Sequence, residues 1–136
     1  MATNNYLFVY GTLLDVDNEF AIYLKNNCSF YANGKFKGRL YDIGEYPGAI
    51  ADDRYAGDVY GSIFMMGDAI SALKYLDDYE GFGPEQEQPN LFVREIIEVK
   101  SDKGVISCWC YLYNLPVDGL RLIESGDYQS YRNNIL

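Results

Sequence analysis

Alternation of hydrophobic and polar positions dominates this chain and predicts a protein built mainly of β-strands. Residues 6–10 are aromatic or β-branched and stop at Gly11, a pattern typical of a buried strand that enters a turn. Further extended segments are predicted at residues 30–43, 57–66, 91–100 and 105–113. If residues 30–43 contain a turn and form two strands, the chain is expected to have about six strands.

Short turn-forming sequences separate these stretches. Asn33-Gly34 is a dipeptide that suits a two-residue hairpin turn, so residues 30–43 are expected to fold back there. The Tyr-Pro-Gly sequence at 46–48 predicts a second turn, and Ser-Asp-Lys-Gly at 101–104 predicts a hairpin loop. A polar loop with two prolines is expected at 81–90.

Two segments show the spacing of helices. Residues 15–27 place apolar side chains on one face and acidic residues near the start, which predicts a short helix. Residues 68–80 form the clearer helix, because Asp68 is a candidate N-cap and Gly81 stands where a C-terminal glycine belongs.

The small number of helices bears on how the strands pack. Two helices cannot cover a flat sheet of about six strands, so an α+β fold with a curled, partly closed sheet is favoured. A length of 136 residues fits one domain over residues 1–136. The hydrophobic period weakens after residue 116, and residues 128–136 are expected to form a surface tail.

One acidic side chain falls on the apolar face of the helix predicted at 68–80. At about 100° per residue, the apolar side chains form one stripe: Ala69, Ala72, Leu73 and Leu76. Glu80 lies four residues after Leu76 and therefore projects from the middle of this stripe. An ionised carboxylate costs several kcal/mol to desolvate, so Glu80 must pair, become protonated or line a cavity.

Two effects are expected to raise the pKa of Glu80. Burial disfavours the charged form, and the negative end of the helix dipole disfavours a nearby anion by roughly 0.3–1 kcal/mol. A carboxyl group with a pKa near neutrality can accept a proton and return it, as a general acid/base requires. The alternative is that the helix frays by Tyr79, so that Glu80 turns to solvent or makes a structural hydrogen bond.

The exit of the first strand is a second candidate site. A glycine at the end of a buried strand allows a sharp turn, whose N–H groups can form a cradle for a carboxylate or a developing oxyanion. This exit consists of Tyr10, Gly11, Thr12 and Leu13. A tight turn without a ligand is the alternative explanation.

Composition narrows the chemistry further. A net charge of -9 disfavours nucleic acid and anionic membranes as partners. There is no histidine, so imidazole cannot serve as base or metal ligand, and a carboxylate is the expected base. The acidic residues at 77, 78 and 80 do not indicate a metal site, because Asp78 points away from Glu80 on the helix.

The three cysteines do not form a disulfide framework. Cys28, Cys108 and Cys110 are sparse and odd in number, which favours a reducing, cytoplasmic location. Cys108 and Cys110 lie two residues apart in an expected strand, so both thiols are expected to face the core. No segment has the pattern of a signal peptide or the roughly 20 apolar residues of a membrane span, so a soluble, untargeted protein is expected.

Several motifs together resemble the gamma-glutamylcyclotransferase-like family. They keep that family's order and spacing and lie at residues 9–13 (VYGTL), 46–48 (YPG), 59–64 (VYGSIF), 76–81 (LDDYEG) and 92–94 (FVR). Residues 116–120 and 125–128 also resemble the end of the small bacterial members. The chain is most similar to the short branch that includes gamma-glutamylaminecyclotransferase.

This resemblance implies an α+β fold around a small mixed β-barrel with two main helices. It implies that Glu80 is the catalytic acid/base. It also assigns binding of a small-molecule γ-glutamyl substrate to Tyr10, Gly11, Thr12 and Leu13. In the implied reaction, the α-amine of the γ-glutamyl group attacks its own γ-carbonyl. This step closes 5-oxoproline and expels an amine or amino acid, without a metal or other cofactor.

Two features depart from the family pattern. Many relatives place a tyrosine where this chain has Phe92, so a phenolic hydroxyl that can touch substrate is missing. The loop at 82–90 is acidic and contains two prolines. Both features support an alternative function, in which a non-catalytic module uses the same cavity to bind a small molecule or a peptide end.

Overall fold

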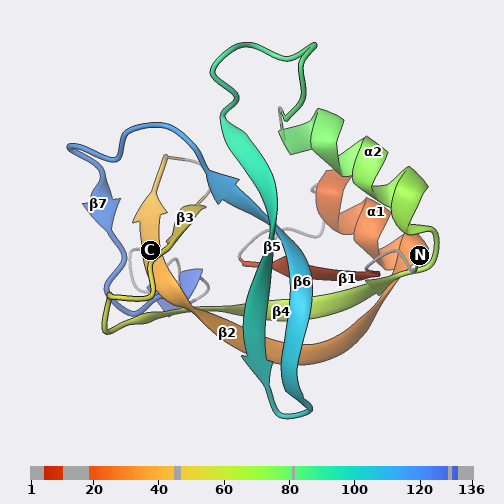
Figure 1. The fold of residues 1–136 in the computed structure, drawn as a ribbon, viewed down its shortest axis with the longest axis horizontal. Helices are drawn as coiled ribbons and strands as arrows, with labels where there is room; N and C mark the ends of the chain where they lie inside the picture. The colour runs from red at the N-terminus through yellow and green to blue at the C-terminus, as the bar shows by residue number, and fades with distance from the viewer. Residues whose placement is uncertain (1–4, 11–18, 45–46, 81, 129, 132–136) are drawn as a thin grey trace.

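The chain forms two helices and seven strands in the part described by the computed structural model, residues 5–10, 19–44, 47–80, 82–128 and 130–131 (Figure 1). In chain order the elements are β1 (Tyr6–Val9), α1 (Glu19–Asn27), β2 (Cys28–Asp42), β3 (Pro47–Ala51), β4 (Asp58–Met66), α2 (Ala69–Glu80), β5 (Phe92–Ser101), β6 (Gly104–Tyr113) and β7 (Arg121–Leu122).

Five of the strands close into a barrel. β2, β4, β1, β6 and β5 are hydrogen-bonded neighbours in that order, and β2 also pairs with β5, which closes the circle. The closing contact is short, with Gly34 opposite Ser101 and Lys35 opposite Lys100. β1 is antiparallel to β4 and parallel to β6, so the barrel is mixed. β3 and β7 pair with the C-terminal part of β2 and extend the sheet. The expected α+β fold around a small mixed barrel is confirmed.

β2 is one continuous strand, so the hairpin predicted at Asn33-Gly34 is wrong. Residues on both sides of this dipeptide pair with β4 without a change of direction. A Cβ atom at Gly34 would lie 2.5 Å from Cγ1 of Val99 and 3.0 Å from the carbonyl oxygen of Lys100. The glycine is needed because β2 meets β5 closely where the barrel closes, and not because the chain turns.

β3 begins within the segment predicted to be a turn. Pro47 and Gly48 are its first residues and lie opposite Asp42 and Tyr41 of β2. A proline is tolerated at the first residue of an edge strand, where its missing N–H breaks no ladder. The turn prediction is therefore wrong for Pro47 and Gly48, and Tyr46 lies outside the described residues.

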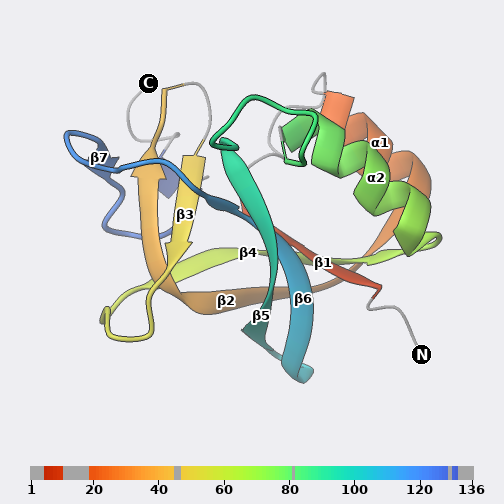
Figure 2. The ribbon, with the colours of Figure 1, turned by 45° about the horizontal axis from the view of Figure 1, so that its top comes forward.

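The two helices pack together on one side of the barrel, and β3 and β7 lie on the opposite side (Figure 1, Figure 2). Tyr23 of α1 stacks on Tyr75 of α2, with ring centroids 4.1 Å apart. Oδ1 of Asp68 accepts a hydrogen bond from the N–H of Ser71 at 3.2 Å, which confirms the predicted cap. The apolar stripe of α2 is buried, as predicted: Ala69, Ala72, Leu73 and Leu76.

The core has two parts. One part fills the barrel and includes the fully buried Cys108 and Cys110, so the prediction that both thiols pack inside is confirmed. The other part lies between the barrel and the helices. None of the helices in the described ranges is long and apolar enough to cross a bilayer.

The C-terminal segment packs against the barrel farther than predicted. Tyr128 is buried in the barrel core, so the prediction of a surface tail is wrong at this residue. The carbonyl of Gly126 accepts a hydrogen bond from the N–H of Tyr60 in β4 at 2.9 Å. This contact joins the segment to β4 two residues before the buried Tyr128. Residues 132–136 lie outside the described part.

Two other local predictions have clear outcomes. β5 and β6 form the predicted hairpin, with Ser101 opposite Gly104. The helix predicted at 15–27 is present as α1 over Glu19–Asn27, and the residues before it lie outside the described ranges.

Candidate active site

Glu80 is the last residue of α2, and its side chain is half-buried. The helix continues through Tyr79, which is exposed, so the alternative of a helix that frays at Tyr79 is wrong. Leu76, one helical turn earlier, is fully buried against the barrel. Because residues four apart share a helix face, Glu80 lies on the inward face of α2.

Burial raises the pKa of Glu80 from 4.5 to about 7. The Glu80 carboxylate also shifts the pKa values of three side chains close to it. Burial raises the pKa values of Tyr10, Cys110 and Tyr111, and the charge of Glu80 adds to each of these shifts. Glu80 therefore lies near the end of β1 and the C-terminal part of β6. A carboxyl group with this pKa can take up and release a proton at neutral pH.

Tyr10 directly follows β1, and its buried side chain joins three strands. Its hydroxyl donates a hydrogen bond to the carbonyl oxygen of Tyr111 in β6. The same hydroxyl accepts a hydrogen bond from the N–H of Ala49 in β3 at 3.2 Å. Tyr10 thus fixes the point at which the chain leaves β1. The rest of the predicted binding segment lies outside the described residues: Gly11, Thr12 and Leu13.

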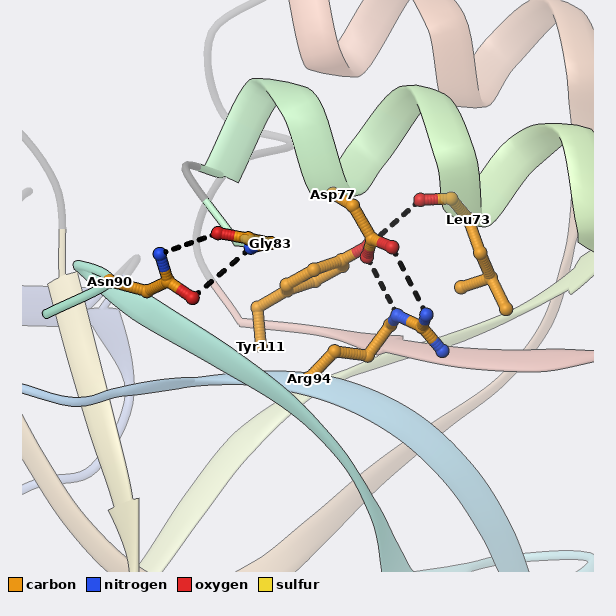
Figure 3. A network of polar contacts seen from close by, with 6 residues as sticks. All are labelled: Leu73, Asp77, Gly83, Asn90, Arg94 and Tyr111. Carbon is orange, nitrogen blue, oxygen red and sulfur yellow. Dashed lines mark hydrogen bonds and ion pairs between the residues drawn. The ribbon is translucent and has the colours of Figure 1, made fainter. Parts of the chain in front are cut away.

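A network of polar side chains joins α2 to β5 and β6 (Figure 3). Arg94 of β5 donates two hydrogen bonds to Asp77 of α2, from Nε to Oδ1 at 2.6 Å and from Nη2 to Oδ2 at 3.0 Å. The hydroxyl of Tyr111 in β6 donates to Oδ1 of Asp77 at 2.7 Å. Two-pronged ion pairs of this kind hold their partners in a defined geometry.

The guanidinium group of Arg94 also lies over two aromatic rings. Its Cζ atom is 4.4 Å from the ring centroid of Trp109 in β6 and 5.7 Å from that of Phe82, which follows α2. Such cation–π contacts are attractive when the cation is partly desolvated. Arg94 therefore contacts α2, β6 and the segment after α2 together.

Asn90 closes the loop that follows α2 (Figure 3). Its Oδ1 accepts a hydrogen bond from the N–H of Gly83 at 3.1 Å, and its Nδ2 donates to the carbonyl of Gly83 at 3.0 Å. Nε2 of Gln88 donates to the same carbonyl at 3.0 Å. The predicted polar loop is thus cross-linked by its own amide side chains beside the end of α2.

Two of the three acidic residues of α2 are bound by neighbouring side chains. Asp77 pairs with Arg94, and Oδ1 of Asp78 accepts a hydrogen bond from Nε2 of Gln86 at 2.9 Å. Within the described ranges, no three acidic or cysteine side chains gather in a way that could hold a metal ion.

The sequence pattern does not single out Asp77, Arg94 and Tyr111 as neighbours of Glu80. Asp77 lies four residues after the buried Leu73, at the border of the apolar stripe, and this spacing is the one available signal. Its two partners come from β5 and β6. Their proximity depends on how the strands close into the barrel.

Phe92 is the first residue of β5. Its side chain is buried between the barrel and the helices and meets the Tyr113 ring edge to face, with centroids 5.7 Å apart. The position therefore offers apolar packing in place of a hydroxyl group.

A closed mixed barrel with two helices on one side is the fold of gamma-glutamylcyclotransferase-like proteins. An AIG2-like protein from Mus musculus has this fold, with a TM-score of 0.64, 20% identity and coverage of 85% of this chain and 82% of that chain. Residues 7–130 match the family described as "Gamma-glutamyl cyclotransferase, AIG2-like". The chain belongs to this family.

Bacterial relatives support the assignment over nearly the whole length. The gamma-glutamylcyclotransferase family protein YtfP of Escherichia coli K12 is 32% identical over 129 residues, which cover 90% of this chain and 94% of that protein. The solution structure of ytfP from Escherichia coli has a TM-score of 0.66 and 29% identity, and the match covers 93% of this chain and 98% of that chain. The resemblance seen in the motifs is therefore confirmed.

Proposed function

We propose that this protein is a γ-glutamyl cyclotransferase that releases 5-oxoproline and a free amine or amino acid from a small γ-glutamyl amine or peptide. The observation that carries the proposal is the half-buried Glu80 on the inward face of α2, with a pKa of about 7. Membership of the family supports the class of substrate. A substrate of this class contains both reacting groups, so catalysis needs orientation and proton transfer.

Glu80 is the proton carrier in the proposed reaction. Its carboxylate takes a proton from the α-ammonium group, and the freed amine attacks the γ-carbonyl carbon to form the ring C–N bond. The tetrahedral oxyanion collapses, and the bond to the leaving nitrogen breaks as Glu80 returns a proton to it. Two protons in all move from the attacking to the leaving nitrogen, which departs as an ammonium ion. Atoms and charge balance without a metal or other cofactor.

The turn after β1 is the proposed substrate-binding segment, with Tyr10 at its start. Backbone N–H groups of Gly11, Thr12 and Leu13 would hold the α-carboxylate or the oxyanion. The two hydrogen bonds of the Tyr10 hydroxyl support this role, because they fix where the turn begins. We also propose that the protein acts as a single domain in the cytoplasm.

The proposal is tested by incubating the protein with a panel of γ-glutamyl amino acids and γ-glutamyl-ε-lysine. Release of 5-oxoproline, measured by chromatography, is expected for at least one member of the panel. Absence of product from every substrate contradicts the proposed activity. Tight, saturable binding of a panel member without turnover supports the non-catalytic binding module instead.

The pH dependence of the reaction is expected to follow the ionisation of Glu80. The base form is the carboxylate, so kcat/KM should be half-maximal near pH 7 and fall about tenfold per pH unit below it. The measurement is initial-rate kinetics from pH 5 to 8, with circular dichroism at each pH to show that the fold persists. A profile that is flat across this range would contradict the role of Glu80.

A further inference from the structure

Glu80 lies within a short segment whose two ends are both fastened. The carbonyl oxygen of Asp77 accepts a hydrogen bond from the N–H of Phe82 at 2.9 Å, which closes the segment of six residues that contains Glu80. The last carbonyls of a helix lack partners inside the helix, so such a contact opposes fraying at this end.

Arg94 contacts both ends of this closed segment. Its guanidinium binds the Asp77 carboxylate at the start, through two hydrogen bonds of 2.6 and 3.0 Å. It lies 5.7 Å from the ring centroid of Phe82 at the end. Tyr111 adds a third hydrogen bond to Asp77, from the neighbouring strand. Two adjacent strands of the barrel therefore hold the segment that carries Glu80.

The ion pair also neutralises a carboxylate that lies close to Glu80 along the helix. Asp77 lies three residues before Glu80, so the two carboxyl groups project from adjacent positions on the helix. The Arg94 guanidinium compensates the charge of Asp77. The raised pKa of Glu80 follows from its burial, and no neighbouring carboxylate is among its causes. The pKa of Glu80 therefore depends on how deeply its carboxyl group is buried.

We propose that Arg94 and Tyr111 are positioning residues which, through Asp77, hold the last turn of α2 against the barrel and keep the Glu80 carboxyl half-buried beside the end of β1. This inference rests on the proposed function for its catalytic meaning. The position of Glu80 can be tested without turnover. Loss of the network would let the last turn fray and expose Glu80 to water, where a carboxyl loses protons more easily.

The decisive variant replaces both charges together, Asp77→Asn with Arg94→Met. Removal of both charges leaves no new unpaired charge near Glu80, so a change in its pKa reports its position. The side-chain carboxyl carbon of Glu80 is followed by NMR as a function of pH. We expect its pKa to fall by at least about one unit toward the ordinary value. If the wild-type protein releases 5-oxoproline, the kcat of the double variant should be about 10- to 100-fold lower than that of wild type, with little change in KM.

The chain offers a matched control in a second Arg–Asp–Tyr cluster. Nε of Arg39 lies 3.3 Å from Oδ2 of Asp52, and Nη1 of Arg39 donates to the Tyr41 hydroxyl at 2.8 Å. The double variant Asp52→Asn with Arg39→Met removes the same two kinds of charge, here joined by a single contact, from β2 and the segment after β3. It should leave the Glu80 titration and the pH profile of kcat unchanged.

The outcomes separate positioning from general stabilisation. A folded Asp77→Asn/Arg94→Met protein in which Glu80 titrates as in wild type overturns the inference, and so does an equal shift in the Arg39 control. If the double variant does not fold, Tyr111→Phe removes one hydroxyl and keeps the buried ring. An unchanged Glu80 pKa in that variant likewise overturns the inference. If the wild-type protein releases no 5-oxoproline, only the proposed function is contradicted, because the titration still tests the position of Glu80.

Discussion

Replacement of Glu80 by glutamine should lower kcat for 5-oxoproline release by roughly 10²- to 10⁴-fold, the range typical for loss of a general acid/base. Glutamine keeps the size of the side chain but cannot take a proton from the α-ammonium group or return one to the leaving nitrogen. KM should change little, because the proposed binding contacts come from the turn after β1. The measurement is steady-state release of 5-oxoproline by wild type and variant at pH 8.

The same variant should be more stable than wild type at high pH. The pKa of Glu80 in the folded state, about 7, lies above the unfolded value of 4.5, so folding favours proton uptake between these values. Wild-type stability therefore falls as the pH rises from 4.5 through 7, by up to about 3 kcal/mol. Glu80→Gln has no such loss.

Chemical denaturation at pH 4 and pH 8 tests this expectation. The free energies of unfolding of the two proteins should agree at pH 4 and diverge at pH 8, with the variant the more stable. This comparison also serves as the control for activity, because a stable but inactive variant has lost chemistry and kept its fold. Turnover of Glu80→Gln at the wild-type rate would rule out Glu80 as the proton carrier.

Elements with complete local signals could be predicted from the sequence. The helix at 68–80 carried its own cap at Asp68 and a continuous apolar stripe, and the structure contains both. The hairpin around 101–104 carried turn residues between two alternating stretches. In both cases the residues that determine the structure lie within a few positions of one another, so their pattern is visible in one segment.

Features that depend on distant contacts could not be predicted in this way. Gly34 permits the close approach of Val99 and Lys100 at the end of β5, far later in the chain, so its role cannot be inferred from the dipeptide. Tyr128 is buried because the C-terminal segment returns to β4, and its own neighbourhood has little hydrophobic period. Turn and tail predictions fail at such positions because tertiary contacts override local preference.

In the candidate site, too, some features follow from local sequence and others from contacts between distant residues. The inward position of Glu80 follows from helical geometry alone, and the structure places it there. The partners of Asp77 come from β5 and β6, 17 and 34 residues later in the chain. The order of strands in the barrel brings Arg94 and Tyr111 together, and a single sequence contains no direct signal of that order.

Truncation of Leu76 should cause a large loss of stability. Its side chain is 0% exposed and lies in the core between α2 and the barrel. Leu76→Ala should lower the free energy of unfolding by about 2–5 kcal/mol, through lost burial and the cavity that remains. For a chain of this size, the melting temperature should fall by about 3 to 4 °C for each kcal/mol of lost unfolding free energy, measured by differential scanning calorimetry.

Ile70→Ala is the matched control for this effect, because it removes a similar volume from the same helix. Ile70 is 73% exposed, so its truncation should change stability by no more than about 0.5 kcal/mol. Since Leu76 lies one turn before Glu80, loosening its packing should also expose the carboxyl and lower its pKa in the protein that remains folded. Equal melting temperatures for Leu76→Ala and Ile70→Ala would mean that α2 is not held to the barrel through this face, and the half-buried position of Glu80 would lose one of its structural causes.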